Sequence, residues 1–177
     1  MSYDLRSVSV LLAEDIHMMQ ELIGYALNSL GISTIYKASD GHSAYELYKL
    51  YKPDVVMCDW QMSPGTGLGL VEKIRQDKAS FTRTVPIIMI TGYASEEYVK
   101  KARDAGVNEF LVKPFTAESL AARLSSIIER PKSFVEAAHY FGPDRRRRSV
   151  RGTYEGPKRR SDDLDDVGEE DNWSVDI

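Results

Sequence analysis

Hydrophobic positions along the first 130 residues follow two alternating periods. Short runs rich in β-branched and other apolar residues predict five strands, at 8–13, 32–37, 54–58, 86–90 and 109–112. Between and after these runs, apolar residues recur at helical spacing and predict five helices, at 18–30, 43–51, 67–77, 96–105 and 117–129. The chain therefore alternates strand and helix from residue 8 to residue 129.

The predicted helices also carry the expected end signals. Ser95 and Thr116 stand at N-cap positions, and Gly31 and Gly106 directly follow predicted helices. Strands that alternate with helices are typical of a parallel sheet covered on both faces. We therefore expect an α/β domain over residues 1–130, with a doubly wound five-stranded parallel sheet of flavodoxin-like order 2-1-3-4-5 and five helices.

The composition changes after residue 130. Only 13 of the last 47 residues are hydrophobic, which is too few for a second core. Ser133 begins a sequence that resembles a capping box, and Phe134, Ala138 and Phe141 follow at i, i+4 and i+7 spacing. We therefore expect residues 131–177 to form a short amphipathic helix and then a charged, mostly disordered tail.

The tail contains a duplicated Tyr-x-Gly-Pro-x-Arg-Arg unit, at 140–146 and 154–160. Residues 141–160 hold eight Lys or Arg against two acids, whereas 161–177 hold eight acids and no base. Such a basic run is typical of a solvated segment, although binding to nucleic acid is an alternative. Because the acidic block would compete for the arginines and no helix-turn-helix pattern is present, DNA binding is not expected.

Composition narrows the class of protein further. The net charge is −4, and the chain has one cysteine, which excludes a disulfide framework. There is no signal-peptide pattern at the N-terminus and no apolar stretch of about 18 residues. These features indicate a soluble cytoplasmic protein without a membrane span.

Chemically active residues follow the predicted strands. Glu14 and Asp15 come after the first strand and Asp59 after the third, while Thr91 and Lys113 end the fourth and fifth. Ligands of doubly wound sheets gather at this edge. Three carboxylates there would repel one another unless a divalent cation such as Mg²⁺, which prefers oxygen ligands, lay between them. One carboxylate could then attack phosphorus, with lysine and metal offsetting the charge of the phosphoryl group.

Four segments carry a family resemblance, in order over about residues 7–130: "LLAEDIHMM", "VVMCDWQMSPGTGLGLVEKIR", "PIIMITGYA" and "EFLVKPF". With them the chain resembles the CheY-like receiver domain of response regulators in two-component signal transduction. The resemblance implies that Asp59 is the phosphoacceptor. It also implies a Mg²⁺ site made by the acidic pair Glu14 and Asp15, by Asp59 and by the backbone carbonyl of Gln61.

The resemblance assigns further roles near this site. Thr91 would be the switch hydroxyl, Phe110 the aromatic switch residue and Lys113 the lysine that contacts the phosphoryl group. The Lys113–Pro114 bond would be cis, an isomer that is uncommon even before proline. Two departures from the family pattern are visible. Pro64 stands one position late in the loop after Asp59, and Phe110 replaces the commoner tyrosine.

The implied function is that of a phosphoacceptor regulator rather than an enzyme with a separate substrate. A histidine kinase or histidine phosphotransfer protein would phosphorylate Asp59, and the chain would promote only its own Mg²⁺-dependent phosphorylation and dephosphorylation. The output would be contact with a further protein. That contact would use the tail or the face made by helix 96–105, strand 109–112 and helix 117–129.

Two rival functions share parts of this pattern. A phosphatase of the haloacid-dehalogenase kind also forms an aspartyl-phosphate, but it would require Asp-x-Asp after the first strand, where this chain has Glu14-Asp15-Ile16. A flavodoxin-like flavin carrier shares the fold. Its flavin phosphate would, however, be repelled by the acids at the strand ends.

Overall fold

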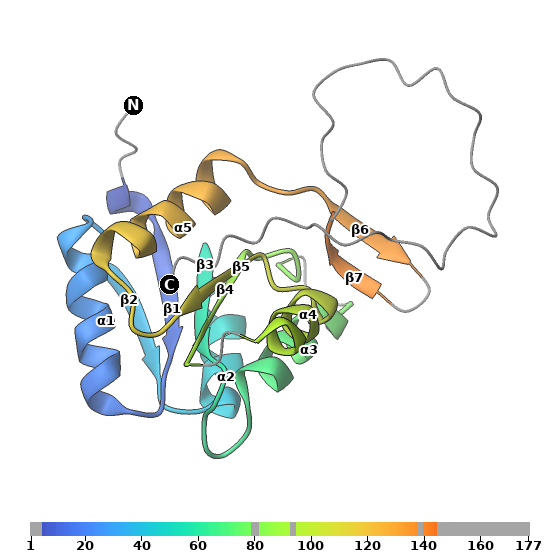
Figure 1. Ribbon diagram of the computed structural model, residues 1–177, viewed down its shortest axis with the longest axis horizontal. Helices are drawn as coiled ribbons and strands as arrows, with labels where there is room; N and C mark the ends of the chain where they lie inside the picture. The colour runs from blue at the N-terminus through green and yellow to red at the C-terminus, as the bar shows by residue number, and fades with distance from the viewer. Residues whose placement is uncertain (1–4, 79–81, 93–94, 138–139, 145–177) are drawn as a thin grey trace. The chain divides into compact units, whose positions relative to one another are not determined.

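The sheet has the predicted order. The computed structural model describes residues 5–78, 82–92, 95–137 and 140–144. Within these ranges, five parallel strands form one sheet in the order β2-β1-β3-β4-β5 (Figure 1). They are β1 (Ser9–Ala13), β2 (Thr34–Ala38), β3 (Val55–Asp59), β4 (Ile87–Thr91) and β5 (Glu109–Val112). The doubly wound α/β fold predicted from the hydrophobic pattern is thereby confirmed.

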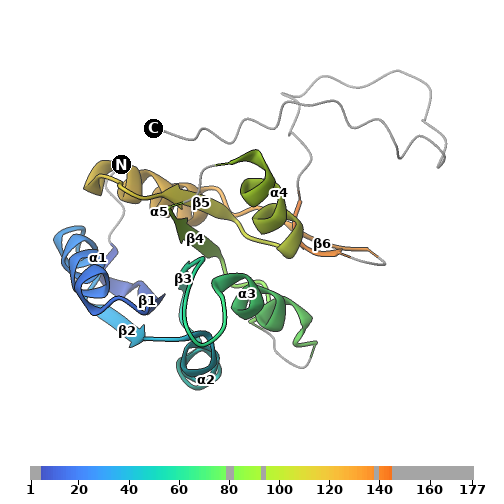
Figure 2. The same ribbon diagram turned by 60° about the horizontal axis from the view of Figure 1, so that its bottom comes forward.

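Five α-helices cover the two faces of the sheet. They are α1 (His17–Ser29), α2 (Gly41–Tyr51), α3 (Gly67–Gln76), α4 (Glu96–Ala105) and α5 (Ala117–Glu129), and a short 3₁₀ turn at Leu5–Ser7 precedes β1. Helices α1 and α5 lie on one face, and α2, α3 and α4 on the other (Figures 1 and 2). Ser95 and Thr116 are the N-caps of α4 and α5 as predicted, and Gly31 and Gly106 adopt a φ of +95° after α1 and α4.

The apolar strands form the centre of the molecule. Every residue of β3 and β4 is buried, as expected for strands covered on both faces. Between the sheet and helices α1 and α5, a core cluster includes Leu12, Met57, Ile90, Leu27 and Leu124. Among the described residues, no helix is long and apolar enough to cross a membrane. The rigid sheet leaves its carboxyl edge as the place where strand-end side chains meet.

The predicted helix after Ser133 is wrong. This segment forms an antiparallel hairpin of β6 (Phe134–Ala137) and β7 (Tyr140–Pro143). In the hairpin register Glu136 lies opposite Phe141, which brings the rings of Phe134 and Phe141 to 5.5 Å from each other on one face. A spacing of seven residues therefore fits a hairpin as well as a helix.

The hairpin packs on the α/β sandwich. Strand β7 contacts α3 and α4, and the Asp144 amide donates a hydrogen bond to the Ser133 carbonyl at the base of the hairpin. The second Tyr-x-Gly-Pro-x-Arg-Arg unit, the acidic block and the predicted disorder of the tail lie outside the described residues.

Candidate functional site at the carboxyl ends of the strands

Three carboxylates meet at the carboxyl edge of the sheet. Glu14, Asp15 and Asp59 each bring a carboxylate oxygen to within 4.8 Å of those of the other two. The register explains this meeting, because Ala13 of β1 pairs with Cys58 of β3 and the next residues of both strands are acids. The convergence predicted from the strand ends is what the structure shows.

The three acids differ in exposure. Glu14 and Asp59 are 1% and 7% exposed, whereas Asp15 is exposed. Burial raises the pKa of both Glu14 and Asp59, although the Lys113 ammonium opposes that shift. Two carboxylates are therefore held in a place where their charge is poorly solvated.

Lys113 supplies the positive charge of the site. Its Nζ lies 2.7 Å from Glu14 Oε2 and 3.0 Å from Asp59 Oδ1. Burial alone would lower the pKa of Lys113, but hydrogen bonds and the charge of the two carboxylates raise it. The Lys113 amide donates to the Thr91 carbonyl at 2.7 Å, and the Lys113–Pro114 bond is cis as predicted.

Gln20 holds the chain beside Glu14, a role that the sequence analysis missed. Its Nε2 donates to the Glu14 carbonyl at 3.2 Å and to the Ala38 carbonyl at 2.9 Å, which ties the end of β1 to the end of β2. Gln20 is buried on α1 together with Ile23 and Leu27. A polar residue within an apolar helical stripe was the signal that could have revealed it.

The loop after β3 returns closely to Asp59. The Gly67 amide donates to the Trp60 carbonyl at 3.0 Å, and a Cβ at Gly67 would overlap the Asp59 carbonyl oxygen. Only glycine therefore lets α3 begin against the backbone of Asp59. Within the loop, the Ser63–Pro64 bond is cis, and the Ser63 amide donates to Asp15 Oδ2 at 3.1 Å.

The other predicted site residues lie at varying distances from the cluster. Thr91 ends β4 at the same edge of the sheet and is fully buried. Phe110 is buried within β5 opposite Met89, two positions before the pair of Thr91 and Val112 that ends the two strands. Gln61 is exposed and pairs with Thr66 in the loop. The switch roles of Thr91 and Phe110 and the ligand role of Gln61 stay predictions.

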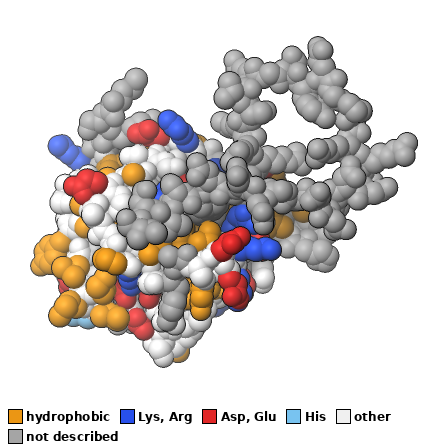
Figure 3. Space-filling model, in the orientation of Figure 1, with side chains coloured by type: hydrophobic (Ala, Val, Ile, Leu, Met, Phe, Trp, Pro, Cys, Tyr) orange, Lys and Arg blue, Asp and Glu red, His pale blue; other side chains and the backbone are white. Residues whose placement is uncertain are grey.

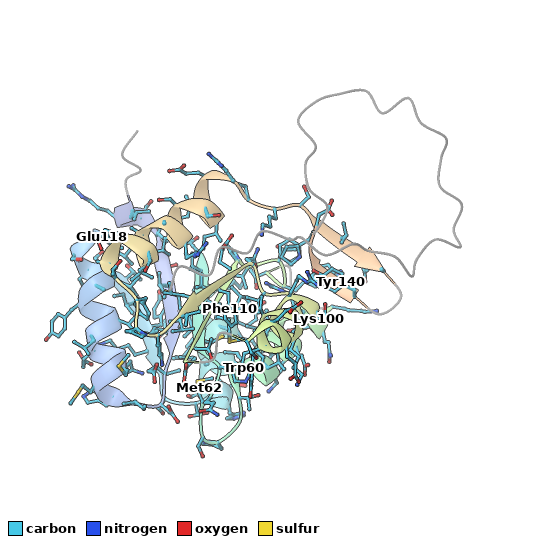
Figure 4. The ribbon with its side chains drawn as sticks, in the orientation of Figure 1. Trp60, Met62, Lys100, Phe110, Glu118 and Tyr140 are labelled. Atoms are coloured by element: carbon cyan, nitrogen blue, oxygen red, sulfur yellow. The ribbon has the colours of Figure 1, made fainter. Side chains whose placement is uncertain are left out.

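Two neighbours of Asp59 complete its surroundings. Cys58 is fully buried, and burial raises the pKa of its thiol to about 12. Trp60, which is labelled in Figure 4, is 9% exposed and packs edge-on against the ring of Tyr98 in α4, with ring centroids 5.0 Å apart. This aromatic pair has no signal in the sequence, because no local pattern links residues so far apart along the chain.

The arrangement suits binding of a hard divalent cation. Three carboxylates face one ammonium, so negative charge remains in excess, and all the available acidic ligand atoms are oxygens. A buried carboxylate beside a lysine is also a chemically plausible nucleophile toward phosphorus, since the ammonium favours its ionised form.

Comparisons with known proteins agree with this geometry. The family description of the response regulator receiver domain matches residues 10–125. The chain is 34% identical to chemotaxis protein CheY-3 of Vibrio cholerae over 125 residues, covering 71% of this chain and 95% of that protein.

Solved structures show the same likeness. Chemotaxis response regulator CheY4 of Vibrio cholerae is 26% identical with a TM-score of 0.63, covering 68% of this chain and 98% of that one. A chain in the CheX–CheY–BeF3–Mg²⁺ complex of Borrelia burgdorferi is 25% identical with a TM-score of 0.62, covering 68% and 88%. The family match contains all the strand-end residues of the site and ends before the β6–β7 hairpin.

Proposed function

Because the chain belongs to the response regulator receiver family, we propose that Asp59 accepts a phosphoryl group from a phosphohistidine donor and that the chain signals by contact with another protein. The observation that carries the proposal is the position of the Asp59 carboxylate, 3.0 Å from the Lys113 ammonium and beside the pair Glu14 and Asp15. The donor would be a histidine kinase or a histidine phosphotransfer protein.

The carboxylate cluster fits Mg²⁺. Glu14, Asp15 and Asp59, with the Gln61 carbonyl, would hold the ion, which when bound offsets the negative charge of the phosphoryl oxygens. The excess of acid over base at this edge supports that assignment, since a cation would relieve the repulsion among the carboxylates.

The chain's own residues then account for the transfer. A carboxylate oxygen of Asp59 attacks the phosphorus of phosphohistidine, the new O–P bond forms, and the P–N bond breaks with its electron pair returning to the imidazole. Lys113 lies close enough to Asp59 to contact a phosphoryl oxygen. The buried Thr91 hydroxyl would donate a hydrogen bond to another phosphoryl oxygen, and Phe110 would pass the change to the face made by α4, β5 and α5.

An apolar surface beside the site suits docking of the donor. On α1, Met18, Leu22 and Tyr25 are 73%, 55% and 69% exposed, and Ile16, next to Asp15, is 56% exposed. Figure 3 shows hydrophobic side chains gathered over this helix. Large apolar side chains in one patch mark an interaction site more often than a solvated face. Their position next to the acid cluster supports contact with a helical phosphodonor protein.

Phosphorylation with a small-molecule donor tests the acceptor. Acetyl phosphate with Mg²⁺ should add one phosphoryl mass to the intact chain, and Asp59→Asn or EDTA should abolish that addition. Asp54→Asn is the matched control. The Asp54 carboxylate accepts hydrogen bonds from the amide and hydroxyl of Ser9 at the opposite end of the sheet, so this substitution should leave labelling unchanged. Equal labelling of the Asp59→Asn chain at another residue would contradict the assignment.

Docking of the donor needs a separate test. We would choose a phosphorylated histidine phosphotransfer protein that labels the wild-type chain, and compare Leu22→Ser with Leu50→Ser. Both leucines are exposed, at 55% and 69%, but Leu50 lies on α2. Leu22→Ser should slow transfer from the protein donor while acetyl phosphate labelling stays unchanged. Equal transfer to both variants would show that α1 is not the docking surface.

A further inference from the structure

The β6–β7 hairpin is packed onto the C-terminal end of α4 through two glycines. A Cβ at Gly142 would lie 2.9 Å from Gly106 Cα and would overlap the Tyr140 hydroxyl, and a Cβ at Gly106 would lie 2.9 Å from the Phe141 carbonyl oxygen. Gly106 is the C-cap of α4, with a φ of +95°. Backbone therefore packs on backbone here, and a single methyl group at either position would separate the hairpin from α4.

Two arginines fasten the same hairpin. Arg75 of α3 is 3% exposed, donates to the Gly106 carbonyl at 3.0 Å, and has its guanidinium 4.9 Å from the centre of the Phe134 ring. Arg83 lies 3.7 Å from the centre of the Phe141 ring and forms a 3.0 Å ion pair with Glu136. Cation–π contacts that are shielded from water are stronger than exposed ones. The hairpin is thus held to α3 and α4 by specific contacts.

The first turn of α4 contacts the residue that follows the phosphoacceptor. Tyr98, in the first turn of α4, contacts Trp60, the residue that follows Asp59. Tyr140 of the hairpin and Trp60 lie on different sides of α4 (Figure 4). Within α4, only Ala102 is buried. The helix packs on α3 and on the hairpin strand β7, and its first turn contacts Trp60. Trp60 and the hairpin therefore contact the same helix near its two ends.

We propose that docking of the β6–β7 hairpin and occupancy of the Asp59 site are coupled through α4. The proposal rests on Asp59 being the phosphoacceptor. The hairpin restrains α4 through the contact of Gly142 and Phe141 with Gly106, and a group added at Asp59 displaces Trp60 and Tyr98 against that restraint. Phosphorylation therefore weakens hairpin docking, and by thermodynamic linkage an undocked hairpin strengthens binding of a phosphoryl analogue.

Beryllofluoride with Mg²⁺ serves as the probe. In a Trp173→Phe background, the fluorescence of Trp60 reports binding to the full chain. We expect Gly142→Ala to bind beryllofluoride about fivefold more tightly than the parent, within the usual range of allosteric coupling. Arg83→Gln, which leaves both glycines in place, should act in the same direction but less. Val135→Ala, a truncation at a residue of β6 that is 37% exposed and keeps both glycines in place, is the matched control and should leave the affinity unchanged.

Two further measurements test the route through α4. Hydrogen exchange of the hairpin amides should accelerate when beryllofluoride binds the wild-type chain. In a Tyr98→Ala background, Gly142→Ala should no longer change the affinity, because the contact that joins α4 to Trp60 is gone.

The outcomes separate this proposal from the phosphoacceptor assignment. Binding that requires Asp59 but is equal in the parent, Gly142→Ala and Arg83→Gln chains, with unchanged hairpin exchange, would overturn the coupling and leave the acceptor role intact. Absence of Mg²⁺-dependent beryllofluoride binding to the wild-type chain would overturn both.

Discussion

At the scale of single residues, the site is dominated by an imbalance of charge. Lys113 contacts Glu14 and Asp59 at once, while Asp15 adds a third carboxylate to the same cluster. The lysine compensates part of this negative charge, and the remainder is what a bound cation would neutralise. The contribution of each of these side chains to the stability of the fold should therefore depend on whether Mg²⁺ is present.

Replacing Lys113 should expose this dependence. Lys113→Met leaves two buried carboxylates without their ammonium partner, which should lower the free energy of unfolding by about 3 kcal/mol in EDTA. Mg²⁺ should restore part of the loss, since a ligand that binds only the folded state stabilises it. Urea denaturation measures both. Lys101→Met, which removes an exposed ion pair with Glu97, is the control and should change stability little. Equal midpoints for the two variants in EDTA would contradict the prediction.

The pH dependence of stability should carry the signature of the buried acids. Burial raises the pKa of Glu14 and Asp59 in the folded chain, so between their ordinary and raised values the folded state binds more protons than the unfolded state. Their contribution to stability is therefore full below the ordinary carboxyl pKa and is lost as pH rises through the raised pKa.

Asp59→Asn removes one of these titrating groups. In EDTA, its free energy of unfolding relative to wild type should increase from acid to neutral pH, as measured by urea denaturation across that range. A difference between the two chains that is constant with pH would show that Asp59 titrates alike in the folded and unfolded states.

At the scale of elements, the sequence predicts those strands and helices whose formation depends on residues close together along the chain. The periods of the apolar residues located β1 to β5 and α1 to α5, and the strand ends located the acids, because parallel strands share one carboxyl edge. The hairpin was mispredicted because Phe134 and Phe141 meet on one face in either a helix or a hairpin. The contact of Phe134 with Arg75, almost 60 residues earlier, decides between them, and no local pattern contains it.

Comparing substitutions at two glycines distinguishes the cost of backbone strain from the cost of lost packing at the end of α4. Gly106 and Gly31 share a φ of +95°, but a Cβ at Gly31 would meet nothing, whereas one at Gly106 would press on Phe141. Gly31→Ala should therefore cost about 1 kcal/mol of stability from the left-handed backbone alone. Gly106→Ala should cost clearly more. Equal losses in urea denaturation would mean that hairpin packing adds nothing at this position.

At the scale of the whole molecule, the hairpin adds structure beyond the family match, which ends at residue 125. A chain ended after Arg130 would lose two cation–π contacts, that of Arg75 with the Phe134 ring and that of Arg83 with the Phe141 ring. Such contacts contribute about 2 kcal/mol to stability when they are shielded from water. The shorter chain should unfold at a lower urea concentration than a chain ended after Asp144, the control that keeps the hairpin. Identical unfolding curves for the two fragments would show that the hairpin does not stabilise the sandwich.

The burial of Cys58 has a practical consequence for chemical labelling. It is the only cysteine of the chain, and with a pKa of about 12 its sulfur stays a thiol, shielded from solvent, at neutral pH. Maleimides and similar reagents react with exposed thiolates, so the native fold gives them almost no target. A cysteine introduced at the exposed Val135 would then be the single attachment point for a fluorophore. The native cysteine therefore does not have to be removed before a fluorophore is attached at a chosen site.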